Sequence, residues 1–112
     1  MVVIKYPPQK RLIATPADWR EFEEWVKYEL RGAEGKFPKF PTDVVHMVAI
    51  VQEECGEAVR AALQTAYEDA SSVYIGNELR QTAAMCFRAW LMLKRLGDFR
   101  AKESDGDREN EG

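Results

Sequence analysis

Residues 42–68 read TDVVHMVAIVQEECGEAVRAALQTAYE, and this stretch predicts one long helix. Thr42 suits the position just before the helix, because its hydroxyl oxygen can accept a hydrogen bond from a free backbone N–H of the first turn. Apolar side chains then recur at steps of three and four residues, as they do along one face of a helix. That apolar stripe comprises Val44, Val48, Val51, Ala58, Val59, Ala62, Leu63 and Ala66.

Three glutamates interrupt the middle of this helix. Glu53, Glu54 and Glu57 lie on an arc of about 100° that borders the apolar stripe, since a helix turns about 100° per residue. Like charges three or four residues apart destabilise a helix by roughly 0.2–0.5 kcal/mol per pair. Arg60 is the only basic residue of the helix, whereas a solvated face usually mixes both charges. Because Mg²⁺ and Mn²⁺ take carboxylate oxygens as ligands, a divalent cation would turn this repulsion into binding.

A helix is also predicted before this stretch. Thr15 can cap its first turn, Pro16 suits the first helical position, and Asp18 favours the positive N-terminal end. The helix is predicted to run to about Arg31 and to stop near Gly32. Its apolar face comprises Trp19, Phe22, Val26 and Leu30.

A loop and a third helix complete the predicted fold. Residues 32–41 hold two prolines and two glycines, which favour a loop. The third helix is predicted to begin between Ser72 and Asn77 and to end at Leu96, with Gly97 as its stop. The fold class is therefore all-α, a helical bundle with three main helices per chain that homo-oligomerisation completes.

Glu78 lies in an unusual setting on the third helix. It falls in the middle of a broad apolar stripe, and Gln81 lies one turn further along. An ionised carboxylate on a buried face is costly unless it is paired or bound to a metal. Two antiparallel helices with a short connection would bring Glu78 and Gln81 opposite Glu54 and Glu57. The stripe comprises Leu79, Thr82, Met85, Cys86, Ala89, Leu93 and Leu96.

The residues VQEECGEA at positions 51–58, followed by ELRQTAA at 78–84, resemble the MazG-like branch of the all-α nucleoside triphosphate pyrophosphohydrolases. The pattern of that family is Glu-Glu-x-x-Glu, a spacer, and Glu-x-x-Asp, and the resemblance spans about residues 36–96. It implies a homodimer or homotetramer that uses Mg²⁺ to hydrolyse a nucleoside triphosphate to a monophosphate and pyrophosphate. Gln81 stands where the family has Asp, so it supplies no negative charge and cannot act as a base.

The resemblance also implies roles for the acids. Glu54, Glu57 and Glu78 would hold Mg²⁺, or Mn²⁺ as a substitute, with Gln81 as an auxiliary ligand. Glu53 would orient or deprotonate the attacking water. If Asp is indispensable at position 81, the chain is instead a degenerate relative that binds nucleotide or metal without turnover.

Four other residues are candidates for binding the substrate. Lys36 would contact phosphate and Phe37 would stack on the base, although an exposed lysine and a loop-anchoring phenylalanine explain the same residues. His46 lies on the acidic arc and would contact metal or nucleotide, unless it is a capping or half-buried polar residue. Arg80 would reach phosphates, as would Arg60, Arg88 and Lys94 from their own or a neighbouring subunit, although a surface charge is the simpler interpretation of each.

Composition limits the remaining possibilities. The 112 residues, 46% of them apolar, fit one domain with a packed core. We expect an N-terminal arm at residues 1–15, an all-α MazG-like domain at 16–97 and a flexible acidic tail at 98–112, which carries the whole net charge of −3. The chain has no basic footprint of a nucleic-acid binder, no signal-peptide pattern and no apolar run of about 18 residues, so neither nucleic acid nor a membrane is an expected partner.

The two cysteines and the acids leave two alternatives open. Cys55 and Cys86 are predicted to be reduced core residues of a cytoplasmic protein, with a disulfide between facing helices as the alternative. The main rival to an enzyme is a helical interaction module, in which the acids form a solvated stripe or bind a basic partner.

Overall fold

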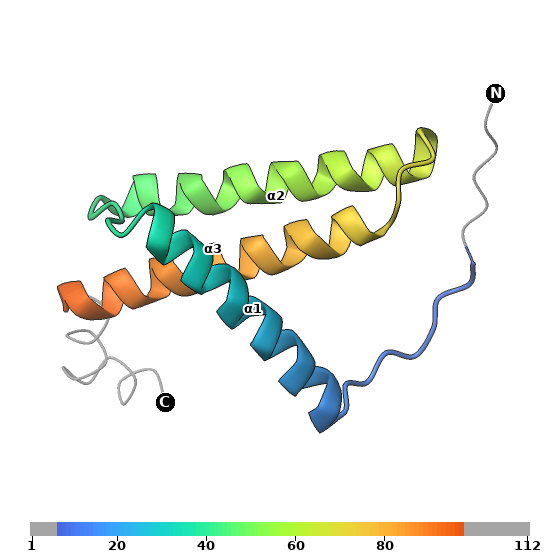
Figure 1. Cartoon of the computed structure of the whole chain (residues 1–112), viewed down its shortest axis with the longest axis horizontal. Coiled ribbons are helices and arrows are strands. Elements are labelled where there is room, and N and C mark those ends of the chain that lie inside the picture. Colours follow the sequence, from blue (N-terminus) through green and yellow to red (C-terminus); the bar gives the residue numbers. More distant parts are fainter. Residues whose placement is uncertain (1–6, 98–112) are drawn as a thin grey trace, which may run out of the picture.

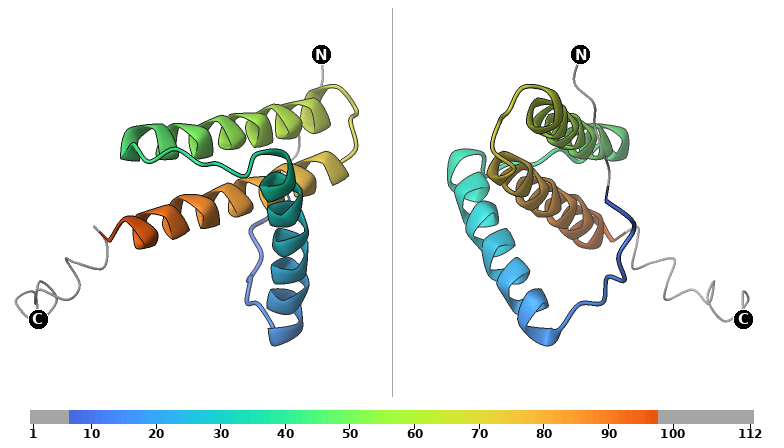
Figure 2. Two further views of the ribbon diagram at one scale, coloured as in Figure 1. Left: turned by 60° about the vertical axis from the view of Figure 1, so that its left-hand side comes forward. Right: turned by 90° about the vertical axis from the view of Figure 1, so that its right-hand side faces the viewer.

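A computed structural model describes residues 7–97 of the chain as three helices (Figure 1). They are α1 (Pro16–Lys36), α2 (Val44–Tyr67) and α3 (Val73–Leu96). Helices α2 and α3 lie side by side as an antiparallel pair, and α1 crosses α3 (Figure 2). The predicted all-α fold with three main helices is confirmed for residues 7–97, where no strand forms. The expected acidic tail lies outside the described residues.

The start of α1 follows the prediction. The Thr15 hydroxyl oxygen accepts a hydrogen bond from the Asp18 backbone N–H at 3.1 Å, and the Thr15 N–H donates to Asp18 Oδ2 at 2.9 Å. These two bonds form a capping box, with Pro16 at the first helical position. The bonded carboxylate is favoured in its charged form, so the pKa of Asp18 is lowered.

The predicted end of α1 is wrong. The helix continues through Gly32 and Gly35 to Lys36, and the Phe37 N–H donates to the Ala33 carbonyl at 2.7 Å. A glycine in a helix costs about 1 kcal/mol, which contacts with α3 can offset. The helix ends where Pro38 disfavours helical backbone at Phe37. Of the loop expected at residues 32–41, only residues 37–41 lie outside the helices, and the connection between α1 and α2 spans residues 37–43.

The boundaries of α2 and α3 are close to those expected. Asp43, rather than the predicted Thr42, caps α2 by accepting a hydrogen bond from the His46 backbone N–H at 2.9 Å. Threonine and aspartate are both good capping residues, so the sequence did not show which of these two neighbours caps the helix. Helix α3 begins at Val73, within the expected range, and stops at Gly97, whose φ of 90° is left-handed.

The core of this single chain is small. The buried residues of the described part are Met47, Ala61, Ala84, Arg88 and Ala89, and Met47 is the only large side chain that is fully buried. The face of α2 that meets α3 repeats every seven residues at Met47, Glu54 and Ala61. The acid-bearing side of α2 therefore turns toward α3, and of the predicted apolar stripe only Val51 and Ala58 are half-buried in this single chain.

The surface of the chain is correspondingly apolar. The exposed fractions of Val48, Val59 and Leu63 on α2 are 60%, 59% and 51%. Cys55 and Cys86 are free, as predicted, but both are exposed and not core residues. No helix among residues 7–97 is long and apolar enough to cross a membrane.

Candidate metal centre

Three carboxylates from two helices converge between α2 and α3. Glu54 and Glu57 come from α2 and Glu78 from α3, and each offers an oxygen within 4.8 Å of the other two. Glu54 and Glu57 are neighbours because residues three apart lie on one side of a helix. The five-residue connection 68–72 makes α3 run back along α2, which brings Glu78 to the same level. We call these three residues the acid cluster.

Burial and like charge both act on the acid cluster. Glu54 and Glu78 are half-buried, whereas Glu57 is exposed. Burial raises the pKa of Glu54 most, and the charges of Glu57 and Glu53 raise it further. Burial also raises the pKa of Glu78, followed by contact with the Glu57 carboxylate and by the charges of Glu54 and Glu29. The cluster therefore favours a bound proton or another positive charge.

The acid cluster also leaves two oxygens without a partner. Glu54 Oε2 and Glu78 Oε2 are buried and accept no hydrogen bond, although a buried acceptor normally has a partner. No ion pair reaches the cluster within residues 7–97, where Lys27 and Glu23 form the sole salt bridge. Carboxylate oxygens that lie close together and lack donors fit a hard divalent cation such as Mg²⁺.

The two remaining predicted acid-site residues lie beside the cluster. Gln81 is half-buried on α3 and lines a pocket together with Glu54. Glu53 is exposed at the edge of the cluster and acts on it through its charge, which raises the pKa of Glu54.

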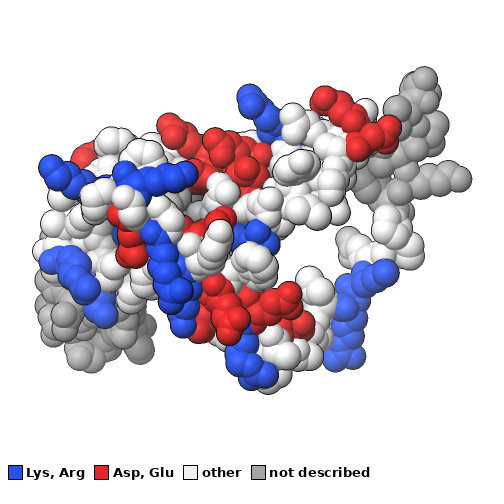
Figure 3. Space-filling view, in the orientation of Figure 1, with Lys and Arg blue, Asp and Glu red and all other residues white. Residues whose placement is uncertain are grey.

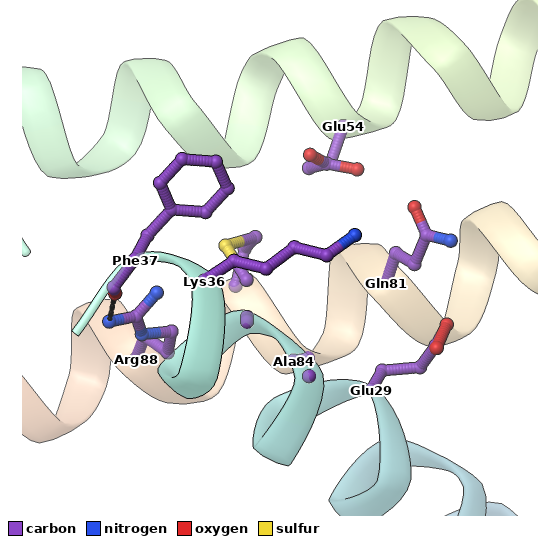
Figure 4. A pocket seen from close by; sticks show the side chains of 10 residues that line it. Glu29, Lys36, Phe37, Glu54, Gln81, Ala84 and Arg88 are labelled. Atoms are coloured by element: carbon purple, nitrogen blue, oxygen red, sulfur yellow. Dashed lines mark hydrogen bonds between the residues drawn. The ribbon is translucent and has the colours of Figure 1, made fainter.

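The pocket lies where the three helices meet and has a volume of about 270 Å³. Figure 4 shows Glu54, Gln81 and Glu29 toward one end of it and Arg88 with Phe37 toward the other. Lys36 extends between these two ends, with its ammonium group directed toward Glu54 and Gln81. The full lining is Glu29, Gly32, Ala33, Lys36, Phe37, Glu54, Gln81, Ala84, Met85 and Arg88.

Both kinds of charge are spread over the face of the molecule that Figure 3 shows. Acidic side chains gather over the middle of α2 and over α1, and basic side chains lie both near the loop 37–43 and elsewhere on this face. The pocket itself is lined by the acidic side chains of Glu29 and Glu54 and by the basic side chains of Lys36 and Arg88.

Two predicted substrate-binding residues lie away from this pocket. His46 is exposed in the first turn of α2, where its backbone N–H donates to Asp43. Arg80 stacks on the ring of Trp25, with its guanidinium carbon 4.2 Å from the ring centroid, and donates a hydrogen bond to Asn77 Oδ1. Neither side chain lines the pocket beside the acid cluster.

Two pocket residues were not selected from the sequence. Glu29 lines the pocket. The sequence pattern that could have indicated this is the spacing of Glu29, Gly32, Ala33 and Lys36, which places these residues on one face of α1. Arg88 was considered as a phosphate contact, but a surface charge was the simpler interpretation, and that interpretation is wrong because Arg88 is only 8% exposed. Its signal was its position seven residues after Gln81, two turns along the same face of α3.

Comparisons of the chain with protein-family models, with characterised proteins and with solved structures found no match.

Proposed function

We propose that the chain is a Mg²⁺-dependent nucleoside triphosphate pyrophosphohydrolase, which hydrolyses a nucleoside triphosphate to a monophosphate and pyrophosphate. The observation that carries this proposal is the acid cluster, whose three carboxylates from two helices lie within 4.8 Å and include two buried oxygens without a partner. The pocket next to it has the Arg88 guanidinium at its other end, and Lys36 extends between the two ends. The resemblance of residues 51–58 and 78–84 to the MazG-like pattern supports the same activity.

Glu54, Glu57 and Glu78 would hold the Mg²⁺, with the Gln81 amide oxygen as an auxiliary ligand. The bound cation would neutralise negative charge on the phosphate oxygens of the substrate and on the leaving pyrophosphate. Cleavage of the bond between the α- and β-phosphates would add the oxygen of water to one of the two fragments, and the products would be the monophosphate and pyrophosphate.

The other residues of the pocket would orient the substrate. Lys36 extends along the pocket and would contact the phosphate chain. Phe37 has an exposed fraction of 67%, so its ring is free to stack on a base. Glu53 is exposed beside the cluster, where its carboxylate would accept a hydrogen bond from the attacking water and take its proton.

We also propose that the chain works as a homodimer or a homotetramer. A core with a single large, fully buried side chain is too small to hold three helices of 21 to 24 residues together. Exposed apolar residues on α2 and α3 are available for contact with a second copy, among them Val59, Leu63 and Leu79. The thiols of Cys55 and Cys86 are free, which fits a cytoplasmic location.

A panel of nucleoside triphosphates, ribo and deoxy, canonical and oxidised, tests the activity when it is incubated with the protein and Mg²⁺. The proposal predicts that at least one nucleotide yields monophosphate and pyrophosphate in equal amounts. Glu57→Gln and Glu78→Gln should lose this activity, whereas Glu24→Gln on the exposed side of α1 should retain it. Release of orthophosphate instead of pyrophosphate would contradict the proposed reaction.

The same samples separate the alternatives. A degenerate relative would show stabilisation by Mg²⁺ without product, and a helical interaction module would show neither. A chain mass of 12.9 kDa makes oligomers easy to distinguish by light scattering, and a monomer at working concentration would refute the proposed assembly.

A further inference from the structure

Arg88 is the most deeply buried charge among the described residues. Its side chain is only 8% exposed, and its Nη2 donates a hydrogen bond to the Phe37 carbonyl oxygen at 2.6 Å. Its guanidinium carbon lies 4.9 Å from the centroid of the Phe40 ring. These contacts hold the loop 37–43 against α3 and fix the guanidinium at the wall of the pocket (Figure 4).

The charge of Arg88 has no carboxylate partner. The sole salt bridge within residues 7–97 joins Lys27 and Glu23 on α1, and neither contacts Arg88. A guanidinium has five N–H donors, and the Phe37 carbonyl uses one of them. A buried cation without an anion is costly, so this end of the pocket favours an anionic group that can accept several hydrogen bonds.

The acid cluster and Arg88 lie at a fixed separation. Gln81, next to the acids, and Arg88 are seven residues apart on α3, which corresponds to about 10 Å along the helix axis. Both line the same pocket, and Lys36 extends between them. A single phosphate group cannot contact both ends, whereas a chain of linked phosphates that begins at a bound cation can.

We propose that Arg88 forms an anion subsite that binds the far end of a polyphosphate chain whose near end is held at the acid cluster. This inference rests on the proposed function for the cation end, but the anion subsite itself depends on Arg88 and Lys36. It predicts that the pocket binds ligands with at least two linked phosphate groups more tightly than orthophosphate.

Isothermal titration calorimetry with tripolyphosphate, pyrophosphate and orthophosphate tests the subsite, each with and without Mg²⁺. Wild-type protein should bind Mg²⁺–tripolyphosphate at least about tenfold more tightly than orthophosphate, since hydrogen bonds to charged groups are the strong ones. Arg88→Met keeps the length of the side chain and should weaken tripolyphosphate binding about tenfold while binding of Mg²⁺ alone is unchanged. Arg20→Met removes an exposed arginine of α1 and should have no effect.

A second measurement does not require a folded Arg88→Met variant. The side-chain Nε–H signal of Arg88 in wild-type protein, assigned by Arg88→Lys, should shift on addition of tripolyphosphate, whereas that of Arg20 should not. Arg88→Lys should fold and bind tripolyphosphate several-fold more weakly than wild type, because an ammonium lacks the planar donor pair of a guanidinium.

The outcomes separate this subsite from the proposed function. The subsite is overturned if Arg88→Met binds tripolyphosphate as tightly as wild type does. It is also overturned if the Arg88 signal does not shift, or if wild-type protein binds orthophosphate as tightly as tripolyphosphate. If Mg²⁺ does not bind, the proposed function fails. The subsite is still supported if the protein binds tripolyphosphate without metal and this binding is weakened in Arg88→Met.

Discussion

Replacing Glu78 with glutamine should stabilise the metal-free protein and reduce its response to Mg²⁺. Glu78 faces Glu54 and Glu57 with carboxylate oxygens within 4.8 Å. Coulomb's law gives about 3 kcal/mol per pair of unit charges at that distance for an effective dielectric constant of about 20, and about 0.9 kcal/mol in bulk water. Because Glu57 is exposed and salt screens the interaction, the repulsion of each pair lies near the bulk-water value. The repulsion of Glu78 by Glu54 and Glu57 together is then about 2 kcal/mol.

Glutamine has the shape of glutamate, so the packing between α2 and α3 should not change. A stabilisation of about 2 kcal/mol corresponds to a rise in Tm of roughly 8–16 °C for a domain of this size. Differential scanning fluorimetry at about pH 8, where the carboxylates are most fully charged, measures it without metal. The same scans with Mg²⁺ should show a large rise in Tm for wild type and a much smaller one for Glu78→Gln, because bound metal stabilises the folded state by mass action.

Glu24→Gln is the matched control, since Glu24 is an exposed residue of α1 outside the acid cluster. Its Tm and its response to Mg²⁺ should equal those of wild type. If Glu78→Gln also leaves both quantities unchanged, the carboxylates do not repel one another and do not share a cation, and the electrostatic argument is wrong.

Further predictions concern pH, the helices and the pocket. The pKa values of Glu54 and Glu78 are raised above 4.5, so both groups hold protons more tightly in the folded chain, and metal-free stability in urea titrations should fall as pH rises from about 4.5 through the raised pKa values. Thr15→Ala removes the cap of α1 and should lower the free energy of unfolding by about 1 kcal/mol in the same titrations. Gly32→Ala should raise it by up to about 1 kcal/mol, because no atom lies within 4 Å of the added methyl group. Gln81→Asp adds a negative charge beside Glu54 and should tighten Mg²⁺ binding in calorimetry, with a lower Tm in the absence of metal.

The fold was largely predictable because its signals are local. Capping at Thr15 and the glycine stop at Gly97 mark helix ends through hydrogen bonds within a few residues, and both are present in the structure. The stop of α1 was not predictable in this way. Gly32 and Gly35 disfavour a helix locally, but contacts of α1 with α3 favour it, and these depend on the tertiary fold.

The convergence of the acids was predictable, whereas the pocket beside them was only partly so. Periodicity places Glu54 and Glu57 on one side of α2, and the short connection to α3 limits where Glu78 can lie. The side of α2 that turns inward was less clear, because valines and acids lie on adjacent sides of the helix. Arg88 and Glu29 act through neighbours on other helices, so their burial depends on how α1 crosses α3.

Anomalous diffraction from crystals soaked in Mn²⁺ tests the central claim most directly, because the manganese signal locates the ion without reference to any assay. The acid cluster predicts a peak bounded by Glu54, Glu57 and Glu78, lost in Glu78→Gln crystals soaked in the same way. Crystals in which these three side chains stay separated from every manganese peak would contradict the claim that α2 and α3 together hold a divalent cation.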